Sequence, residues 1–98
     1  MNTLQETEEF SKWLKALSDM RAKARILTRL KLAEQGNFGD HKSVGHRVSE
    51  MRVDVGPGYR LYYTKIGKVV YLLLCGGDKS SQDRDIARAQ SMAERLET

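Results

Sequence analysis

A short turn between two stretches of alternating polarity sets the strongest constraint on the fold. The only proline, Pro57, stands between Gly56 and Gly58. This predicts a tight turn, because proline fixes its own φ and glycine adopts conformations closed to other residues. Residues 59–64 then alternate in polarity, which is typical of a β-strand. Arg60 lies in the middle of that strand. A strand that only built a core would not need it, so we expect this strand to have a functional face.

Three antiparallel strands are predicted around the turn, over residues 47–55, 59–66 and 68–76, with residues 66–67 as a two-residue hairpin between the last two. The expected register places Arg60 opposite Asp54 and Leu73. A one-residue slip would bury charged side chains, which fixes the phase of the first strand. One face of the sheet is then expected to carry a polar set: Glu50, Arg52, Asp54, Arg60, Tyr62 and Tyr71.

Helical periodicity is clear on both sides of these strands. Apolar residues recur at helical spacing from Phe10 to Leu17, with Thr7 as the expected N-cap. A second helix is predicted over residues 20–35, ended by Gly36. A third is expected to run to residue 96, started by a capping box of Ser80 and Asp83.

The remaining segments complete the predicted fold. Residues 1–5 are interpreted as a short edge strand and residues 37–45 as a loop. The sequence therefore predicts one α+β domain over residues 1–98. In it, an N-terminal helical hairpin and a C-terminal helix pack against one face of a small antiparallel sheet.

Composition narrows the class of protein. The 98 residues include a single cysteine, Cys75, so no internal disulfide can form, and a reducing cytoplasm fits. The first ten residues are acidic and do not resemble a signal peptide, and the longest apolar run, residues 69–75, is too short to span a membrane. The net charge of +4, with seven basic residues between positions 12 and 31, favours a polyanionic partner.

The candidate chemistry centres on the arginines. Arg52 and Arg60 on neighbouring strands are expected to clamp one phosphate, because guanidinium groups match phosphate oxygens two at a time. Tyr62 and Tyr71 are expected to stack on unpaired bases. The alternative is an ion pair between Asp54 and Arg60 on a solvated sheet face.

Two further segments are candidates for binding or proton transfer. The glycine-rich stretch 76–81 opens a helix, so its backbone N–H groups could hold a phosphate, or it could be a capped strand-to-helix turn. His41 and His46 could act as acid or base, or be solvated loop residues. Neither belongs to a metal-ligand spacing, so no metal and no cofactor are predicted. Lys42 is a candidate phosphate contact.

Four motifs together resemble one known family. They are Gly-Asp-x-Lys at residues 39–42, Val-Ser-Glu-x-Arg at 48–52, Gly-Pro-Gly-Tyr-Arg at 56–60 and Cys-Gly-Gly-Asp-Lys-Ser-x-Gln at 75–82. In this combination the chain resembles the RelE/ParE superfamily of toxins from type II toxin–antitoxin systems, in its HigB-like "addiction module killer protein" branch. The likeness extends from Phe10 to about Ala93.

The resemblance implies a cytoplasmic toxin that cuts mRNA on the ribosome without a metal. It also implies neutralisation by a partner antitoxin, often of the helix-turn-helix type, with operator DNA bound only through the antitoxin complex. By position, Arg60 matches the strand arginine that stabilises the phosphate, and Arg52 and Lys79 match two further basic positions. The expected contacts to RNA are Lys42, Tyr62, Tyr71, Asp78 and His41.

One family feature has no counterpart in this chain. The C-terminal tyrosine that some relatives use for proton transfer is missing, and the nearest residues are Asp83 and Asp85. His41, His46, Tyr62 and Asp78 are candidate substitutes. Two other functions therefore stay open: a ParE-like toxin that blocks a protein such as gyrase without cutting RNA, and a plain RNA-binding or interaction domain.

Overall fold

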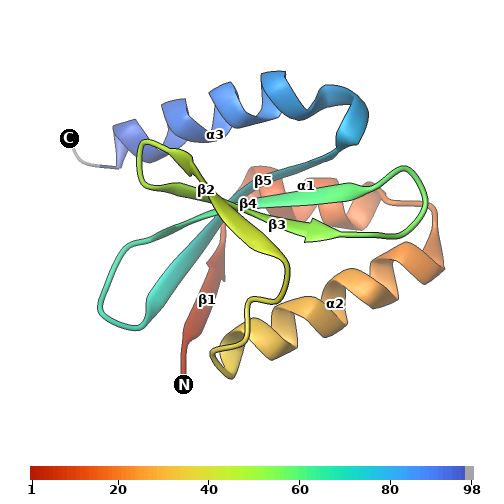
Figure 1. Cartoon of the computed structure of the whole chain (residues 1–98), viewed down its shortest axis with the longest axis horizontal. Coiled ribbons are helices and arrows are strands. Elements are labelled where there is room, and N and C mark those ends of the chain that lie inside the picture. Colours follow the sequence, from red (N-terminus) through yellow and green to blue (C-terminus); the bar gives the residue numbers. More distant parts are fainter. Residues whose placement is uncertain (97–98) are drawn as a thin grey trace.

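The computed structural model describes residues 1–96 as an α+β fold with a five-stranded sheet and three α-helices (Figure 1). The elements, in chain order, are β1 (Thr3–Glu6), α1 (Glu8–Ala16), α2 (Met20–Glu34), β2 (His41–Gly45), β3 (Val48–Val53), β4 (Tyr59–Lys65), β5 (Val70–Asp78), the short 3₁₀ helix η1 (Lys79–Ser81) and α3 (Gln82–Arg95). Within these residues, no helix is both long and apolar enough to cross a membrane.

The sheet is larger than the sequence predicted, and it is mixed. Its strand order is β1-β5-β4-β3-β2, with β1 parallel to β5 and every other pair antiparallel. The predicted edge strand near the N-terminus is confirmed, so the chain does not open with a helical hairpin. The prediction of a loop over residues 37–45 is wrong from His41 onward, because His41–Gly45 pairs with β3.

The predicted ends of the first two helices are confirmed. Thr7 Oγ1 accepts a hydrogen bond from the Phe10 N–H at 3.0 Å, and Asp19 caps α2 in the same way. Gly36 follows α2 with a φ of 94°, a conformation that favours glycine. The expected capping box of α3 does not form. Instead, the Asp78 side chain caps η1 by accepting from the Ser80 N–H at 2.8 Å.

Helices cover both faces of the sheet, whereas the sequence analysis placed them all on one (Figure 1). We call the side packed against α1 and α2 the aromatic face. Its core contains Phe10, Ile26, Met51, Leu61 and Tyr63. We call the side packed against α3 the arginine face. Its smaller core consists of Val48, Tyr62, Leu74, Cys75, Ala89 and Ala93, and the same side of the strands carries Glu50, Arg52 and Arg60.

The strand register differs from the prediction by an even number of residues between β3 and β4. Arg52 lies opposite Arg60, and Glu50 lies opposite Tyr62. A shift of two residues keeps each side chain on its face, so the predicted sharing of one face by Arg52 and Arg60 is confirmed. The predicted pairing of Asp54 with Arg60 is wrong, because the connecting loop spans residues 54–58.

Between β4 and β5 the observed register differs more from the predicted one. The connection spans residues 66–69, longer than the predicted two-residue hairpin, and a β-bulge interrupts the register between Tyr62 and Tyr63. Arg60 therefore lies opposite Gly77 in place of Leu73. A bulge inserts one unpaired residue and so changes the face of those beyond it. For this reason Tyr71 lies on the aromatic face, opposite Lys65.

Candidate functional site

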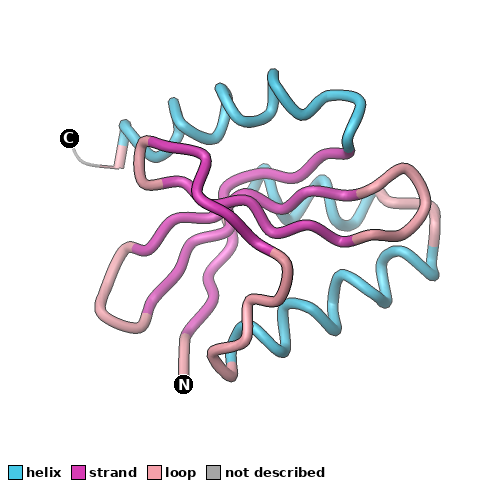
Figure 2. The backbone as a smooth tube through the Cα atoms, viewed as in Figure 1, coloured by secondary structure: helices cyan, strands magenta, loops and turns pink. Residues whose placement is uncertain are grey.

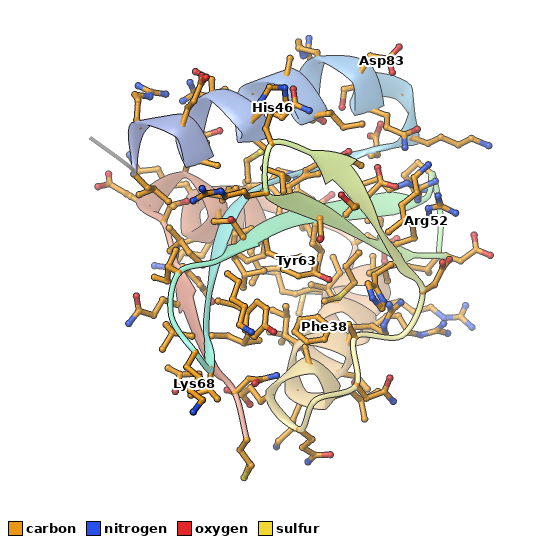
Figure 3. The ribbon with its side chains drawn as sticks, turned by 60° about the vertical axis from the view of Figure 1, so that its left-hand side comes forward. Phe38, His46, Arg52, Tyr63, Lys68 and Asp83 are labelled. Carbon is orange, nitrogen blue, oxygen red and sulfur yellow. The ribbon has the colours of Figure 1, made fainter. Side chains whose placement is uncertain are left out.

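Two arginines lie side by side at one end of the arginine face. Arg52 of β3 and Arg60 of β4 are cross-strand partners, so their side chains leave the sheet on the same side. The Arg52 side chain is 32% exposed and the Arg60 side chain 12%. Figure 3 shows Arg52 at the opposite end of the β2–β3 hairpin from His46. The structure thus brings together the two arginines that the sequence singled out.

A buried carboxylate lies beneath the two arginines. Glu50 is 0% exposed. Its Oε1 accepts from Arg52 Nε at 3.1 Å and lies 3.8 Å from Arg60 Nε. Its Oε2 accepts from Gln82 Nε2 at 2.7 Å and from the Tyr62 hydroxyl at 3.4 Å. Within the described residues, Arg60 Nε is the one buried side-chain nitrogen or oxygen without a hydrogen bond.

A third arginine holds the edge of this site from the other side of the sheet. Arg29 of α2 donates to the backbone carbonyls of Arg52, Phe38 and Asp40. The Asp40 carboxylate in turn lies 4.0 Å from Arg52 Nη1. Arg29 is one of the seven basic residues between positions 12 and 31 that were expected to favour a polyanionic partner. The structure uses it to fix the chain that leads into β2.

Lys79 and Lys42 extend the positive charge around the arginine pair. The Lys79 N–H donates to the Gly58 carbonyl at 2.8 Å, so η1 lies beside the β3–β4 loop at the same end of the molecule (Figure 2). A Cβ on Gly58 would lie 3.5 Å from Arg60 Nη1 and 3.7 Å from Lys79 Cβ, which places both side chains around one point. Lys42 is exposed on β2 opposite Glu50, and therefore on the arginine face.

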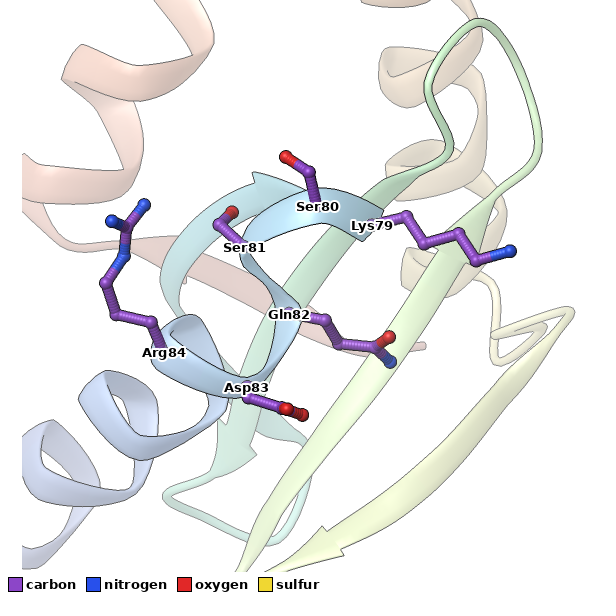
Figure 4. A pocket seen from close by; sticks show the side chains of 6 residues that line it. All are labelled: Lys79, Ser80, Ser81, Gln82, Asp83 and Arg84. Atoms are coloured by element: carbon purple, nitrogen blue, oxygen red, sulfur yellow. The ribbon is translucent and has the colours of Figure 1, made fainter.

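An open surface pocket of about 540 Å³ lies beside this cluster, at the start of α3. Its lining residues are Lys79, Ser80, Ser81, Gln82, Asp83 and Arg84. Figure 4 shows Lys79 and Gln82 pointing across the strands and Arg84 pointing the other way. The Ser80 hydroxyl and the Ser80 N–H both donate to Asp78, and these bonds lower the pKa of the Asp78 carboxyl. Asp78 therefore serves as a cap, and the glycines before it belong to β5.

Several residues proposed from the sequence for RNA contact lie elsewhere. Tyr62 is 0% exposed beneath α3, so its ring is not accessible for base stacking, and burial raises the pKa of its hydroxyl. Tyr71 lies on the aromatic face against Phe38, with ring centroids 4.9 Å apart. His41 is exposed on that same face, also beside Phe38. His46 occupies the tip of the β2–β3 hairpin.

Cys75 and Trp13 pack in the two cores, outside the candidate site. Cys75 is 3% exposed, and burial raises the pKa of its thiol to about 12, so it is a small core residue that stays protonated. Trp13 packs with the aromatic-face core, between Phe10 and Tyr59 and over Gly76. Neither residue reaches the arginines.

Sequence reasoning missed the residues that support the arginine pair. Glu50 was placed on the correct face, but without a role, and Gln82 and Asp40 were not singled out. The alternation of Glu50 and Arg52 at i and i+2 was the available signal, because such residues share a face of a strand. No local pattern connects Gln82 to Glu50, which is 32 residues earlier in the chain.

This arrangement is suited to binding a phosphate. Two guanidinium groups with two nearby lysines provide many N–H donors around one point, and planar guanidinium groups pair with phosphate oxygens in a bidentate manner. No group of three or more residues with metal-binding side chains (His, Cys, Asp or Glu) is found between residues 1 and 96.

Comparison with known proteins gives a relative of nearly the same length. No protein-family model matches the chain. A Haemophilus influenzae protein, described only as uncharacterized, is 47% identical over 93 residues, which cover 95% of this chain and 94% of the relative. The chain therefore belongs to the same protein family as this Haemophilus relative.

Proposed function

We propose that the chain is the toxin of a type II toxin–antitoxin system, an mRNA endoribonuclease of the RelE/ParE superfamily that acts on the ribosome in the cytoplasm. The observation that carries the proposal is the direct pairing of Arg52 with Arg60 across two strands. Its support from sequence is the set of four motifs that resemble the HigB-like branch, and Arg60 stands within one of them. The cognate antitoxin is the expected protein partner.

The proposed reaction needs positive charge where the arginines lie. The 2′-oxygen of one nucleotide bonds to the adjacent phosphorus, while the bond from phosphorus to the next 5′-oxygen breaks. The 2′-hydroxyl loses its proton and the leaving oxygen gains one, which yields a 2′,3′-cyclic phosphate and a 5′-hydroxyl. Negative charge grows on the non-bridging oxygens in the transition state. Arg52 and Arg60 would stabilise that charge, and Lys79 and Lys42 would bind phosphate.

The test is expression of the chain alone in a bacterial host, with mRNA 5′ ends mapped across the transcriptome. The wild type is expected to stop growth and to create new ends inside translated codons. Arg60→Ala is expected to abolish both effects, because losing one such donor costs about 10²- to 10³-fold in rate. Lys68→Ala is the control, since it removes an exposed cation in the β4–β5 connection, far from Arg52 (Figure 3).

One observation favours a second function. The groups considered for proton transfer lie away from the arginine pair or have another role: Tyr62 is buried, His41 lies on the opposite face, His46 occupies a distant hairpin tip, and Asp78 caps η1. Such a site suits a toxin that blocks a protein such as gyrase without cutting RNA. Growth arrest and DNA damage signalling with intact mRNA would identify that function. Neither arrest nor cleavage would indicate a binding domain.

A further inference from the structure

A charged residue is buried on an inner strand of the sheet, where an apolar residue would normally lie. Glu50 is 0% exposed, between the buried apolar residues Val48 and Met51 of the same strand. An ionised carboxylate is costly to bury unless it is paired and hydrogen-bonded. Its position therefore has to be explained by its partners, and these include both arginines of the site.

The two arginines cannot adopt this arrangement unaided. Arg52 and Arg60 are direct cross-strand partners, and like charges in that position repel each other. Glu50 Oε1 faces both Nε atoms, at 3.1 Å from Arg52 and 3.8 Å from Arg60. One oxygen thus opposes the repulsion. It accepts a hydrogen bond from Arg52 Nε and attracts the buried Arg60 Nε by charge, without a hydrogen bond. At the terminal nitrogens, Arg60 Nη1 donates to the Tyr59 carbonyl at 3.1 Å and Arg52 Nη1 lies 4.0 Å from the Asp40 carboxylate.

The carboxylate is itself held by the neighbouring strand β4 and by α3. Gln82, the first residue of α3, donates to Oε2 at 2.7 Å, and Tyr62 donates at 3.4 Å. Both donors are neutral, so they orient the carboxylate without cancelling its charge. Because burial and the nearby Glu50 charge raise the pKa of Tyr62, its hydroxyl keeps its proton as a donor.

We propose that Glu50 is a positioning residue that sets Arg52 and Arg60 as one pair for a single phosphate, with Gln82 linking that pair to the start of α3. This inference rests on the proposed function for its catalytic consequence. Glu50 does not touch RNA, since it is fully buried. Its charge lowers the attraction of the face for RNA while it holds the geometry that cleavage needs.

A positioning role predicts opposite effects on RNA affinity and on cleavage rate when Glu50 is changed. A purely structural role predicts that both are lost together. Glu50→Gln keeps the size of the side chain, removes one negative charge and leaves the arginines poorly anchored. Binding of a single-stranded RNA oligonucleotide is expected to tighten about 2- to 5-fold, with a steeper salt dependence. The cleavage rate in a reconstituted translation mixture is expected to fall about 10- to 100-fold. Glu94→Gln, the same change at an exposed position of α3, should alter neither quantity.

A second readout does not depend on cleavage. In ¹⁵N-edited NMR spectra of the wild type, Arg52 and Arg60 are expected to give protected, dispersed Nε–H signals, which move to the free-arginine position in Glu50→Gln. If the wild type cuts no RNA, the proposed function fails, and these signals still decide whether Glu50 positions the pair. Unchanged signals in Glu50→Gln would overturn the positioning role. So would unchanged cleavage by Glu50→Gln in a wild type that does cut RNA, or a parallel loss of binding and cleavage in the folded variant.

A milder variant covers the case in which Glu50→Gln does not fold. Gln82→Leu keeps the charge of Glu50 and removes the donor to Oε2 at the surface end of the site. Cleavage is expected to fall about 3- to 10-fold with RNA affinity unchanged, because the carboxylate can then rotate away from the arginines. Wild-type cleavage by Gln82→Leu, with wild-type Nε–H signals, would contradict the proposed link from α3 to the pair.

Discussion

The two faces of the sheet are built by the same strands but differ in chemistry. On the aromatic face, rings pack in series. Phe38 stacks on Tyr63 with centroids 5.1 Å apart (Figure 3). Its ring also contacts that of Tyr71, with centroids 4.9 Å apart. On the arginine face, the small residues Ala89 and Ala93 of α3 cover part of the strands. The other part carries a buried carboxylate and two arginines.

This difference shows how a small chain can place the residues that stabilise its fold on one face of a sheet and its candidate site on the other. Because neighbouring residues of a strand point to opposite faces, Met51 lies in the aromatic-face core, while Glu50 and Arg52 on either side of it belong to the candidate site. The aromatic face can supply most of the burial, and the arginine face can then hold charges that contribute little to folding. Substitutions at neighbouring positions should separate the two contributions.

The largest difference between an effect on stability and an effect on cleavage is expected at the adjacent residues Met51 and Arg52. Met51 is 1% exposed, so Met51→Ala should lower the free energy of unfolding by about 3 kcal/mol through the cavity it leaves. Arg52→Lys keeps a cation near Glu50 but loses the planar fork, so it should cost less than about 1 kcal/mol in stability. Cleavage per folded molecule should be unchanged in Met51→Ala and about 10²-fold lower in Arg52→Lys. Urea unfolding and cleavage assays on the same samples would test this, and equal effects on both quantities would contradict it.

A smaller difference, in stability alone, is expected between alanine substitutions at two adjacent glycines of β5, one facing each side of the sheet. A Cβ on Gly76 would lie 2.4 Å from the Trp13 ring on the aromatic face, and one on Gly77 would lie 1.9 Å from Asp85 Oδ2 on the arginine face. Gly76→Ala should destabilise the fold by about 2 kcal/mol, because the packed ring has little room to move. Gly77→Ala should cost about 1 kcal/mol, because the carboxylate can rotate if it gives up its bond from Ser81.

Thermal unfolding measures both glycine variants. In an Asp85→Ala background, Gly77→Ala should have almost no further effect, since the clashing carboxylate is gone. A greater cost for Gly77→Ala than for Gly76→Ala would show that the arginine face is the more rigidly packed of the two.

The smallest effect is expected at the tip of the β2–β3 hairpin. His46 has a φ of 52°, a left-handed conformation that asparagine adopts more readily. His46→Asn should therefore raise stability by about 0.5 kcal/mol. Cleavage should not change, because this tip lies at the far end of the hairpin from Arg52 (Figure 3). Reduced cleavage with raised stability would instead mean that the tip takes part in binding.

The sequence pattern correctly predicted the features of the fold that depend only on residues near one another in the chain. The N-cap at Thr7 and the end of α2 at Gly36 follow from spacing within one segment, and the shared face of Arg52 and Arg60 follows from the alternation of two neighbouring strands. The register was wrong because it depends on loop length, and nothing local reveals that the loops span residues 54–58 and 66–69. No sequence pattern indicates the bulge beside Tyr62 either, and this bulge places Tyr71 on the other face of the sheet.

The position of α3 had the greatest consequence for the candidate site. The sequence analysis placed this helix on the same face of the sheet as the first two, and the structure places it on the other face. Once α3 covers the arginine face, Tyr62 becomes a buried donor to Glu50, and Gln82 reaches the same carboxylate. The arginines could be predicted from the sequence, whereas the network that supports them depends on how α3 packs.

The most direct test of the central claim is a double-mutant cycle on cleavage. Rates would be measured in a reconstituted translation mixture for the wild type, Arg52→Ala, Arg60→Ala and the double variant. If the arginines act as a unit on one phosphate, each single variant should lose about 10²-fold and the double variant little more than either. Full additivity, with a loss of about 10⁴-fold in the double variant, would mean that the two arginines act independently. Single variants that cut RNA at the wild-type rate would contradict the assignment of the site.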